Sequence, residues 1–164
     1  GMSIRDTLAR LPAFSDFGAE DIELLDRLLV ERRWPDGHVF LREGSRAGSV
    51  QAPMYVVLEG TVAVTTGART ELGRMGPGDL FGHMALFDQG ARSAACQAVG
   101  PVRTAELDRL TFDALRRSRA SAGARFDHLV ARQLARDLRR LTDLVQQAAL
   151  GDEAPIRREL GLAS

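Results

Sequence analysis

The sequence predicts a mainly β domain, built as a sandwich or closed roll, with helices before and after it. Between about residues 32 and 107, short apolar runs alternate with turns rich in Gly and Pro, which is the pattern of an all-β domain. On both sides of this region, apolar residues recur at the three- and four-residue spacing of helices. The 164 residues, 45% of them hydrophobic, suffice for one such domain and are too apolar for a disordered chain.

The N-terminal region, residues 3–31, is predicted to be helical. Ile4, Leu8 and Leu11 share one helix face, and Pro12 ends that first helix. A second helix is expected over residues 21–30, with four apolar side chains turned inward: Ile22, Leu25, Leu28 and Leu29.

The β-roll is predicted over residues 32–107. Strands are expected at 38–42, 54–58, 61–65, 70–75, 92–99 and 102–107. Turns are expected at the Gly- and Pro-containing segments 35–37, 43–45, 59–60, 67–69, 76–79 and 100–101. A single cysteine, Cys96, falls in a predicted strand and is expected in the core.

The C-terminal region, residues 108–150, is predicted to contain two helices followed by a tail at 151–164. Asp108 is a helix cap, and the helix after it is expected to end near Arg119. Gly123 is predicted to interrupt the helices and to act as a hinge. The long helix then covers 124–150, with Gly151 as its terminating residue.

The long helix carries an apolar seam with spacings of 4, 3, 4 and 3 residues. Its members are Leu134, Leu138, Leu141, Val145 and Ala148. This two-heptad seam either packs on the chain's own β-roll or pairs with a second copy, and we expect a homodimer through the helix 124–150. The charged residues between the seam positions are predicted to form a solvated face: Arg132, Arg136, Asp137, Arg139, Arg140 and Asp143.

Charge and cysteine content exclude several classes of protein. The 22 basic residues balance the 22 acidic ones, which argues against a strongly basic nucleic-acid binder. One cysteine excludes an internal disulfide and a Cys-rich metal site, and a reducing compartment is the simplest setting.

No apolar run approaches the roughly 20 residues that span a bilayer, and the first residues do not form a signal peptide. We therefore expect a cytoplasmic protein without a membrane anchor.

The histidines argue against an enzyme on a related β-roll, such as a metal-dependent cupin. Only His38, His83 and His128 are present, and no two of them form an H-x-H pair. The sequence also lacks the nucleophile-elbow motif of hydrolases. We expect neither a catalytic residue nor a metal site.

The segment from Gly78 to Ala95 has the features of a small phosphate cradle. A Gly-bounded turn leads into one predicted helical turn at 82–87, whose backbone N–H groups form an anion site. Arg92 follows on the next predicted strand, and its guanidinium matches the geometry of a phosphate. There is no lysine and no Walker spacing, so the cradle is not a P-loop.

This segment resembles the phosphate-binding cassette of the cyclic-nucleotide-binding domain family, which reads roughly Phe-Gly-Glu-x-Ala-Leu, a spacer, and Arg-(Ser/Thr)-Ala. The matching residues are Phe81-Gly82-His83-Met84-Ala85-Leu86 and Arg92-Ser93-Ala94. Further matches are Trp34-Pro35-Asp36-Gly37, Arg42-Glu43-Gly44, Tyr55-Val56-Val57-Leu58-Glu59-Gly60 and Gly76-Pro77-Gly78-Asp79. The resemblance covers about residues 8–148. It implies a double-stranded β-helix, a jelly-roll-like fold, with a long C-terminal helix.

The resemblance also implies which residues bind the ligand. They are Phe81, Gly82, His83, Met84, Ala85, Arg92, Ser93 and Thr142. Gly82 and the N–H groups of 83–85 would meet the cyclic phosphate, with Arg92 and Ser93 on its oxygens. Thr142 would reach the purine. His83 stands where the family has the Glu that accepts the ribose 2′-OH, and only a neutral imidazole can accept in its place.

The implied function is a regulatory module that binds cyclic AMP or cyclic GMP and signals to an unknown protein partner through its C-terminal helix. The alternative is a degenerate fold that serves as a dimeric interaction scaffold without nucleotide, which the His at position 83 favours. Transcription factors of this family continue into a helix-turn-helix, which needs on the order of 20 residues. Only 14 residues follow Leu150, so direct DNA binding is not expected.

Overall fold

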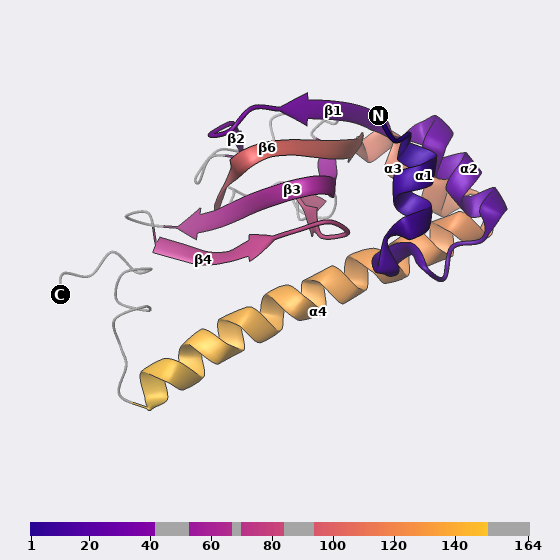
Figure 1. Ribbon diagram of the computed structural model, residues 1–164. Coiled ribbons are helices and arrows are strands. Elements are labelled where there is room, and N and C mark those ends of the chain that lie inside the picture. The colour runs from indigo at the N-terminus through magenta and orange to yellow at the C-terminus, as the bar shows by residue number, and fades with distance from the viewer. Residues whose placement is uncertain (42–52, 67–69, 84–93, 151–164) are drawn as a thin grey trace.

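The computed structural model describes residues 1–41, 53–66, 70–83 and 94–150. The helices are α1 (Ile4–Arg10), the short 3-10 helix η1 (Pro12–Phe14), α2 (Ala19–Leu28), α3 (Arg109–Arg117) and α4 (Ser121–Ala149). The strands are β1 (Val30–Trp34), β2 (Val39–Leu41), β3 (Met54–Thr66), β4 (Thr70–Met75), β5 (Leu80–Phe81) and β6 (Ala95–Leu107). The helices gather at one end of the sheet, and α4 runs from there along one side of the molecule (Figure 1).

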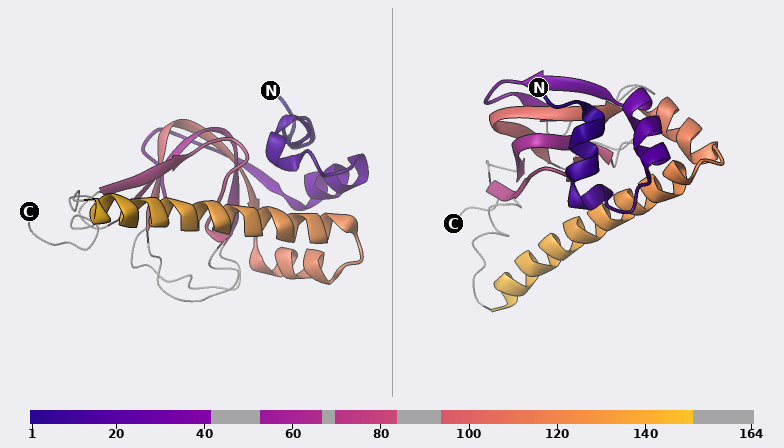
Figure 2. Two further views of the ribbon diagram at one scale, coloured as in Figure 1. Left: turned by 90° about the horizontal axis from the view of Figure 1, so that it is seen from below. Right: turned by 45° about the vertical axis from the view of Figure 1, so that its right-hand side comes forward.

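The antiparallel sheet confirms the predicted fold class. Its strand order is β1-β6-β3-β4, with β2 paired to β6 and β5 paired to β3. The two central strands, β3 and β6, are 13 residues long and pair with each other along most of their length. The sheet curves over α4 when it is viewed from below (Figure 2), as expected for a roll flanked by helices.

Two predicted strand breaks are wrong. The segments 54–58 and 61–65 belong to the single strand β3, and the turn at 100–101 lies inside β6. Register shifts on both sides of Glu59 bend β3, and Gly60 takes a left-handed φ of 95°. A Cβ on Gly60 would lie 2.4 Å from the Pro101 carbonyl oxygen. The glycine therefore permits close strand contact at a bulge, where the sequence pattern suggests a turn.

The boundary between the second helix and the roll also differs from the prediction. The helix α2 ends at Leu28, and Val30 already begins the strand β1. This strand pairs only with β6 among the described residues, and its first four side chains are exposed. An exposed edge strand needs no alternation of apolar residues, so its sequence, VERRW, gave no strand signal.

The predicted helix interruption at Gly123 is wrong. Gly123 lies inside the first turn of α4, which begins at Ser121. A Cβ at this position would lie 2.5 Å from the Leu115 carbonyl oxygen of α3. The glycine is therefore explained by the close contact between α3 and α4.

Asp108 caps α3 as predicted, because its side chain accepts from the Thr111 N–H at 2.7 Å.

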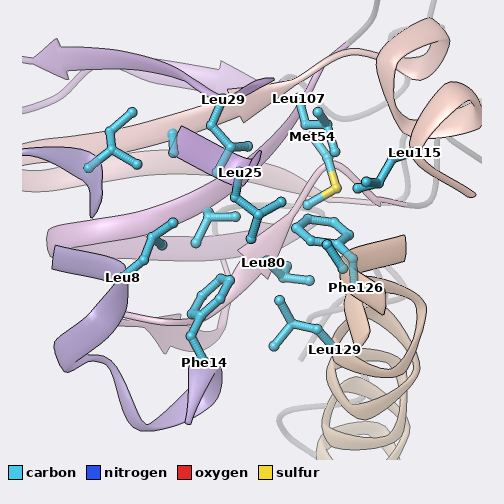
Figure 3. Packing of buried hydrophobic residues seen from close by; sticks show 14 of the residues in the cluster. Leu8, Phe14, Leu25, Leu29, Met54, Leu80, Leu107, Leu115, Phe126 and Leu129 are labelled. Atoms are coloured by element: carbon cyan, nitrogen blue, oxygen red, sulfur yellow. The ribbon is translucent and has the colours of Figure 1, made fainter. Parts of the chain in front are cut away.

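Two hydrophobic clusters hold the fold together. The larger lies between the helices and the sheet, where Phe14, Leu25, Leu80 and Phe126 converge (Figure 3). The smaller lies inside the roll and includes Tyr55, Val57, Val62, Met75, Phe81 and the predicted core residue Cys96. Among the described residues, no helix is both long and apolar enough to cross a membrane.

Arg103 of β6 ties the N-terminus to the sheet. Its side chain is 3% exposed, and it donates to Glu31, to the Met2 carbonyl, to Thr7 Oγ1 at 2.8 Å and to Glu59 Oε1 at 3.1 Å. Burial alone would lower the pKa of Arg103, but the hydrogen bond and charge of Glu31, joined by Glu59, raise it. The guanidinium thus remains charged and holds α1, β1 and β3 to the strand β6.

We expect Arg103→Ala to lower the free energy of unfolding by about 2–4 kcal/mol, since a buried, hydrogen-bonded charge is lost while its partly exposed carboxylate partners regain water. Urea denaturation measures the effect. Arg33→Ala is the matched control, because Arg33 lies opposite Arg103 in the strand pair and also approaches Glu31, but its side chain is 70% exposed. A similar small loss in both variants would contradict the role given to Arg103.

Candidate functional site

The candidate site begins at the turn between β4 and β5. The Asp79 N–H donates to the Gly76 carbonyl at 3.0 Å, and Asp79 Oδ2 accepts from the Gly76 N–H at 2.9 Å. Gly78 has a φ of 92°, and its N–H donates to the Val57 carbonyl of β3 at 2.8 Å. The predicted turn is therefore confirmed, and it is anchored to the central strand.

The strand β5 passes from this turn into the predicted cassette. Its two residues point to opposite faces: Leu80 enters the cluster under the helices, and Phe81 enters the roll. The Phe81 ring stacks on Tyr55, with ring centroids 4.7 Å apart. This packing fixes the direction in which the chain reaches Gly82.

Gly82 is required by its surroundings. Its φ is 77°, in the left-handed region, and a Cβ would lie 3.0 Å from the Pro53 carbonyl oxygen. The glycine turns the chain out of β5 and directs the next residue, His83, back under α4.

His83 is buried, with 4% of its surface exposed. Its Nε2 lies 3.3 Å from Asp137 Oδ2 on α4. Neither ring nitrogen makes a hydrogen bond to any described residue, so the 3.3 Å approach is a contact without hydrogen-bond alignment. A buried imidazole whose two nitrogens make no hydrogen bond is uncommon in folded proteins.

The helix α4 closes over this region through polar contacts. Gln133, 1% exposed, accepts from the buried Leu80 N–H at 3.0 Å. Its side-chain oxygen also accepts from Arg136 at 2.8 Å, and its amide donates to Asp137 Oδ1 at 3.1 Å. Arg136 in turn lies 3.5 Å from Asp79 Oδ1. One helix face thus connects the β4–β5 turn, β5 and His83.

The prediction of a solvated charged face on α4 is wrong for Asp137 and Arg140, which are half-buried. Asp137 and Arg136 contact the site, and Arg132 lies 3.8 Å from Asp16 near the N-terminal helices. The Arg140 guanidinium lies against β4, where a Cβ on Gly73 would be 2.8 Å from Arg140 Nε. Arg139 and Asp143 are exposed as predicted.

The structure brings together some of the predicted ligand-binding residues. Phe81, Gly82 and His83 are adjacent at the end of β5. Thr142 is exposed on α4, and its hydroxyl donates to the Leu138 carbonyl of its own helix at 3.0 Å. The remaining predicted residues lie outside the described part of the chain: Met84, Ala85, Arg92 and Ser93.

Sequence reasoning missed Gln133, Asp137 and Arg140. They follow one another at spacings of four and three, so they share a helix face next to the apolar seam. The sequence therefore contains a second set of residues at heptad spacing. Because these residues are polar, the pattern is the same as that of an ordinary solvated helix face. Only the contact of α4 with β4 and β5 shows that this face is partly covered.

The described side chains of the apolar seam lie in two environments, one in the core and the others exposed to solvent. Leu134 packs against the core, whereas Leu138, Leu141 and Val145 are 64%, 46% and 61% exposed. Beyond Gln133, no described residue of α4 is buried. The interpretation that the seam packs on the chain's own roll therefore fails for these three side chains.

Residues 31–119 match the family model described as the cyclic nucleotide-binding domain. The chain belongs to this family. It is also 30% identical over 149 residues to the CRP-like cAMP-activated global transcriptional regulator of Mycobacterium tuberculosis, covering 85% of this chain and 62% of that protein. The chain thus spans less than two thirds of that relative's length.

Solved structures agree with the fold of this cyclic nucleotide-binding domain. The catabolite activator protein of Thermus thermophilus is 30% identical, with a TM-score of 0.66 over 85% of this chain and 63% of that one. A cyclic nucleotide-binding domain from Methylobacillus flagellatus has a TM-score of 0.75 at 23% identity, covering 91% and 84% of the two chains. The second likeness concerns the fold alone.

Within the described ranges, the domain contains no group of three or more His, Cys, Asp or Glu side chains arranged to hold a metal ion. His38 stacks on Trp34, with ring centroids 4.1 Å apart. His128 is exposed on α4.

We expect Gln133→Leu to lower the free energy of unfolding by about 1–3 kcal/mol, because the Leu80 N–H is left buried without an acceptor. Urea denaturation measures the change. Gln146→Leu is the control: it makes the same replacement at an exposed position of the same helix and is expected to change stability by less than about 0.5 kcal/mol. Equal stability of the two variants would contradict the proposed role of Gln133.

Proposed function

We propose that this cyclic nucleotide-binding domain is a regulatory module that binds cyclic AMP or cyclic GMP at the segment 81–93. The observation that carries the proposal is His83, a buried imidazole with two unsatisfied nitrogens. It stands at the position where the family resemblance implies the ribose hydroxyl. Family membership and the cAMP-activated relative support the same ligand class.

In this proposal, Gly82 and the N–H groups of residues 83–85 bind the cyclic phosphate, and Arg92 and Ser93 bind its oxygens. Thr142 is the proposed contact to the purine, which it reaches once its hydroxyl leaves the Leu138 carbonyl. The described geometry supports the placement of Gly82, since its left-handed φ turns the chain away from β5 at the start of the cradle.

The signal passes through α4 to a protein partner. Gln133 bonds to β5, and Arg136 lies beside Asp79 of the preceding turn. Any change in this turn or in β5 on ligand binding therefore acts directly on the helix. We place the protein in the cytoplasm, acting as a regulator and not as an enzyme.

We expect Arg92→Ala to weaken nucleotide binding by roughly 2–5 kcal/mol, because the phosphate then lacks its charged partner. Calorimetric titration of the wild type and the variant with cyclic AMP and with cyclic GMP measures this loss. Arg139→Ala, at an exposed position of α4, is the matched control and should bind like the wild type. Unchanged affinity of Arg92→Ala would show that the nucleotide binds elsewhere.

A second candidate function is favoured by the exposed seam of α4. A degenerate domain that dimerises and binds partner proteins without nucleotide would still need Leu138, Leu141 and Val145 on its surface. The same titration separates the two functions. No binding of either nucleotide by the wild type would favour the scaffold.

We further propose that the seam pairs with a second copy of the chain. Leu138→Glu combined with Leu141→Glu is expected to give monomers in sedimentation equilibrium, since charges would be buried between the helices. Arg139→Glu combined with Gln146→Glu reverses one charge and adds another at exposed positions beside the seam, and should leave the dimer intact. A wild type that sediments as a monomer would overturn this proposal.

A further inference from the structure

We propose that Asp137 of α4 is a positioning residue that fixes His83 as the hydrogen-bond acceptor for a ligand hydroxyl. This inference rests on the proposed nucleotide binding and adds a residue that neither the family motif nor the sequence indicates. It starts from the unsatisfied nitrogens of His83 and from the carboxylate beside one of them.

A neutral imidazole carries one N–H donor and one acceptor nitrogen, and its surroundings decide which nitrogen has the proton. A carboxylate can only accept. Because Asp137 Oδ2 lies 3.3 Å from His83 Nε2, the proton belongs on Nε2, where a small movement aligns it with the carboxylate. The lone pair is then on Nδ1, the second buried nitrogen without a partner.

A hydroxyl group is the complement of that lone pair, since its O–H donates to Nδ1. When it binds, both nitrogens of His83 are satisfied: one by Asp137 and one by the ligand. Leaving either nitrogen unpaired in the buried site is unfavourable. The hydroxyl and the docked α4 therefore stabilise each other through one imidazole ring.

Hydrogen bonds hold Asp137 in the position from which it contacts His83. Its second oxygen, Oδ1, accepts from Gln133 Nε2 at 3.1 Å, and Gln133 is in turn bonded to the Leu80 N–H. The carboxylate side chain is 37% exposed, so its replacement does not open a large cavity in the core. Asp137 therefore acts on the ligand only through His83.

The experiment combines calorimetric titration of the full chain with cyclic AMP and cyclic GMP and NMR of ¹⁵N-labelled histidine, recorded at about pH 8, where free imidazole is neutral. The His83 signal is identified by its loss from the spectrum of His83→Gln. With nucleotide bound, wild-type His83 is expected as the Nε2–H tautomer. Asp137→Ala should lose this preference and bind on the order of tenfold more weakly.

Two variants separate positioning from a structural effect. Asp137→Glu restores a carboxylate and should recover most of the affinity and the tautomer. Asp143→Ala makes the same replacement at an exposed position of α4 and should behave like the wild type. Asp137→Asn keeps the shape with a weaker acceptor; it is expected to bind several-fold more weakly and replaces the alanine variant if that one does not fold.

The outcomes distinguish this inference from the proposed function. If the wild type binds nucleotide and Asp137→Ala keeps both affinity and tautomer, Asp137 has no positioning role, while the proposed function stands. A weaker Asp137→Ala whose tautomer is unchanged also overturns the inference, because the loss is then structural. If the wild type binds neither nucleotide, both the function and the inference fall.

Discussion

The backbone N–H of Leu80 is the constraint on which the arrangement of the site depends. This group lies in a buried position at the start of the two-residue strand β5, and Gln133 of α4 accepts its hydrogen bond. An unmet N–H at this place would be costly, so β5 and α4 must stay together. The contacts of Arg136 with Asp79 and of Asp137 with His83 follow from that docking, because these residues share the helix face of Gln133.

The same helix has two different environments along its length. Its first half contributes Phe126, Leu129 and Val130 to the core under the N-terminal helices. After Gln133 it has only half-buried or exposed side chains among those described, and three of the exposed ones are large and apolar. The residues of α4 that contact the site are Gln133, Arg136 and Asp137, which lie where the helix leaves the apolar core, and their contacts are polar.

The fold class and the family were readable from the sequence, because corner glycines and the cassette motif are local signals. The limits of β1 and the continuity of β3 and β6 were not. The strand β1 lies at an exposed sheet edge, where apolar and polar residues need not alternate. The continuity of the long strands was hidden because the bulge at Gly60 has the sequence pattern of a turn. For the site, the motif singled out Gly82 and His83, which follow the short strand β5, a strand that the sequence pattern did not indicate. It contained no information on Asp137, since that contact joins residues 54 positions apart through the docking of α4.

The contact of Gly123 with the Leu115 carbonyl has a consequence for movement. With no room for even one carbon atom between them, α3 and the start of α4 form a single stiff elbow. A pivot at Gly123 would have to break this contact. A displacement of α4 that keeps this contact therefore carries α3 with it. A partner that binds α3 would then sense the state of a site that it never touches.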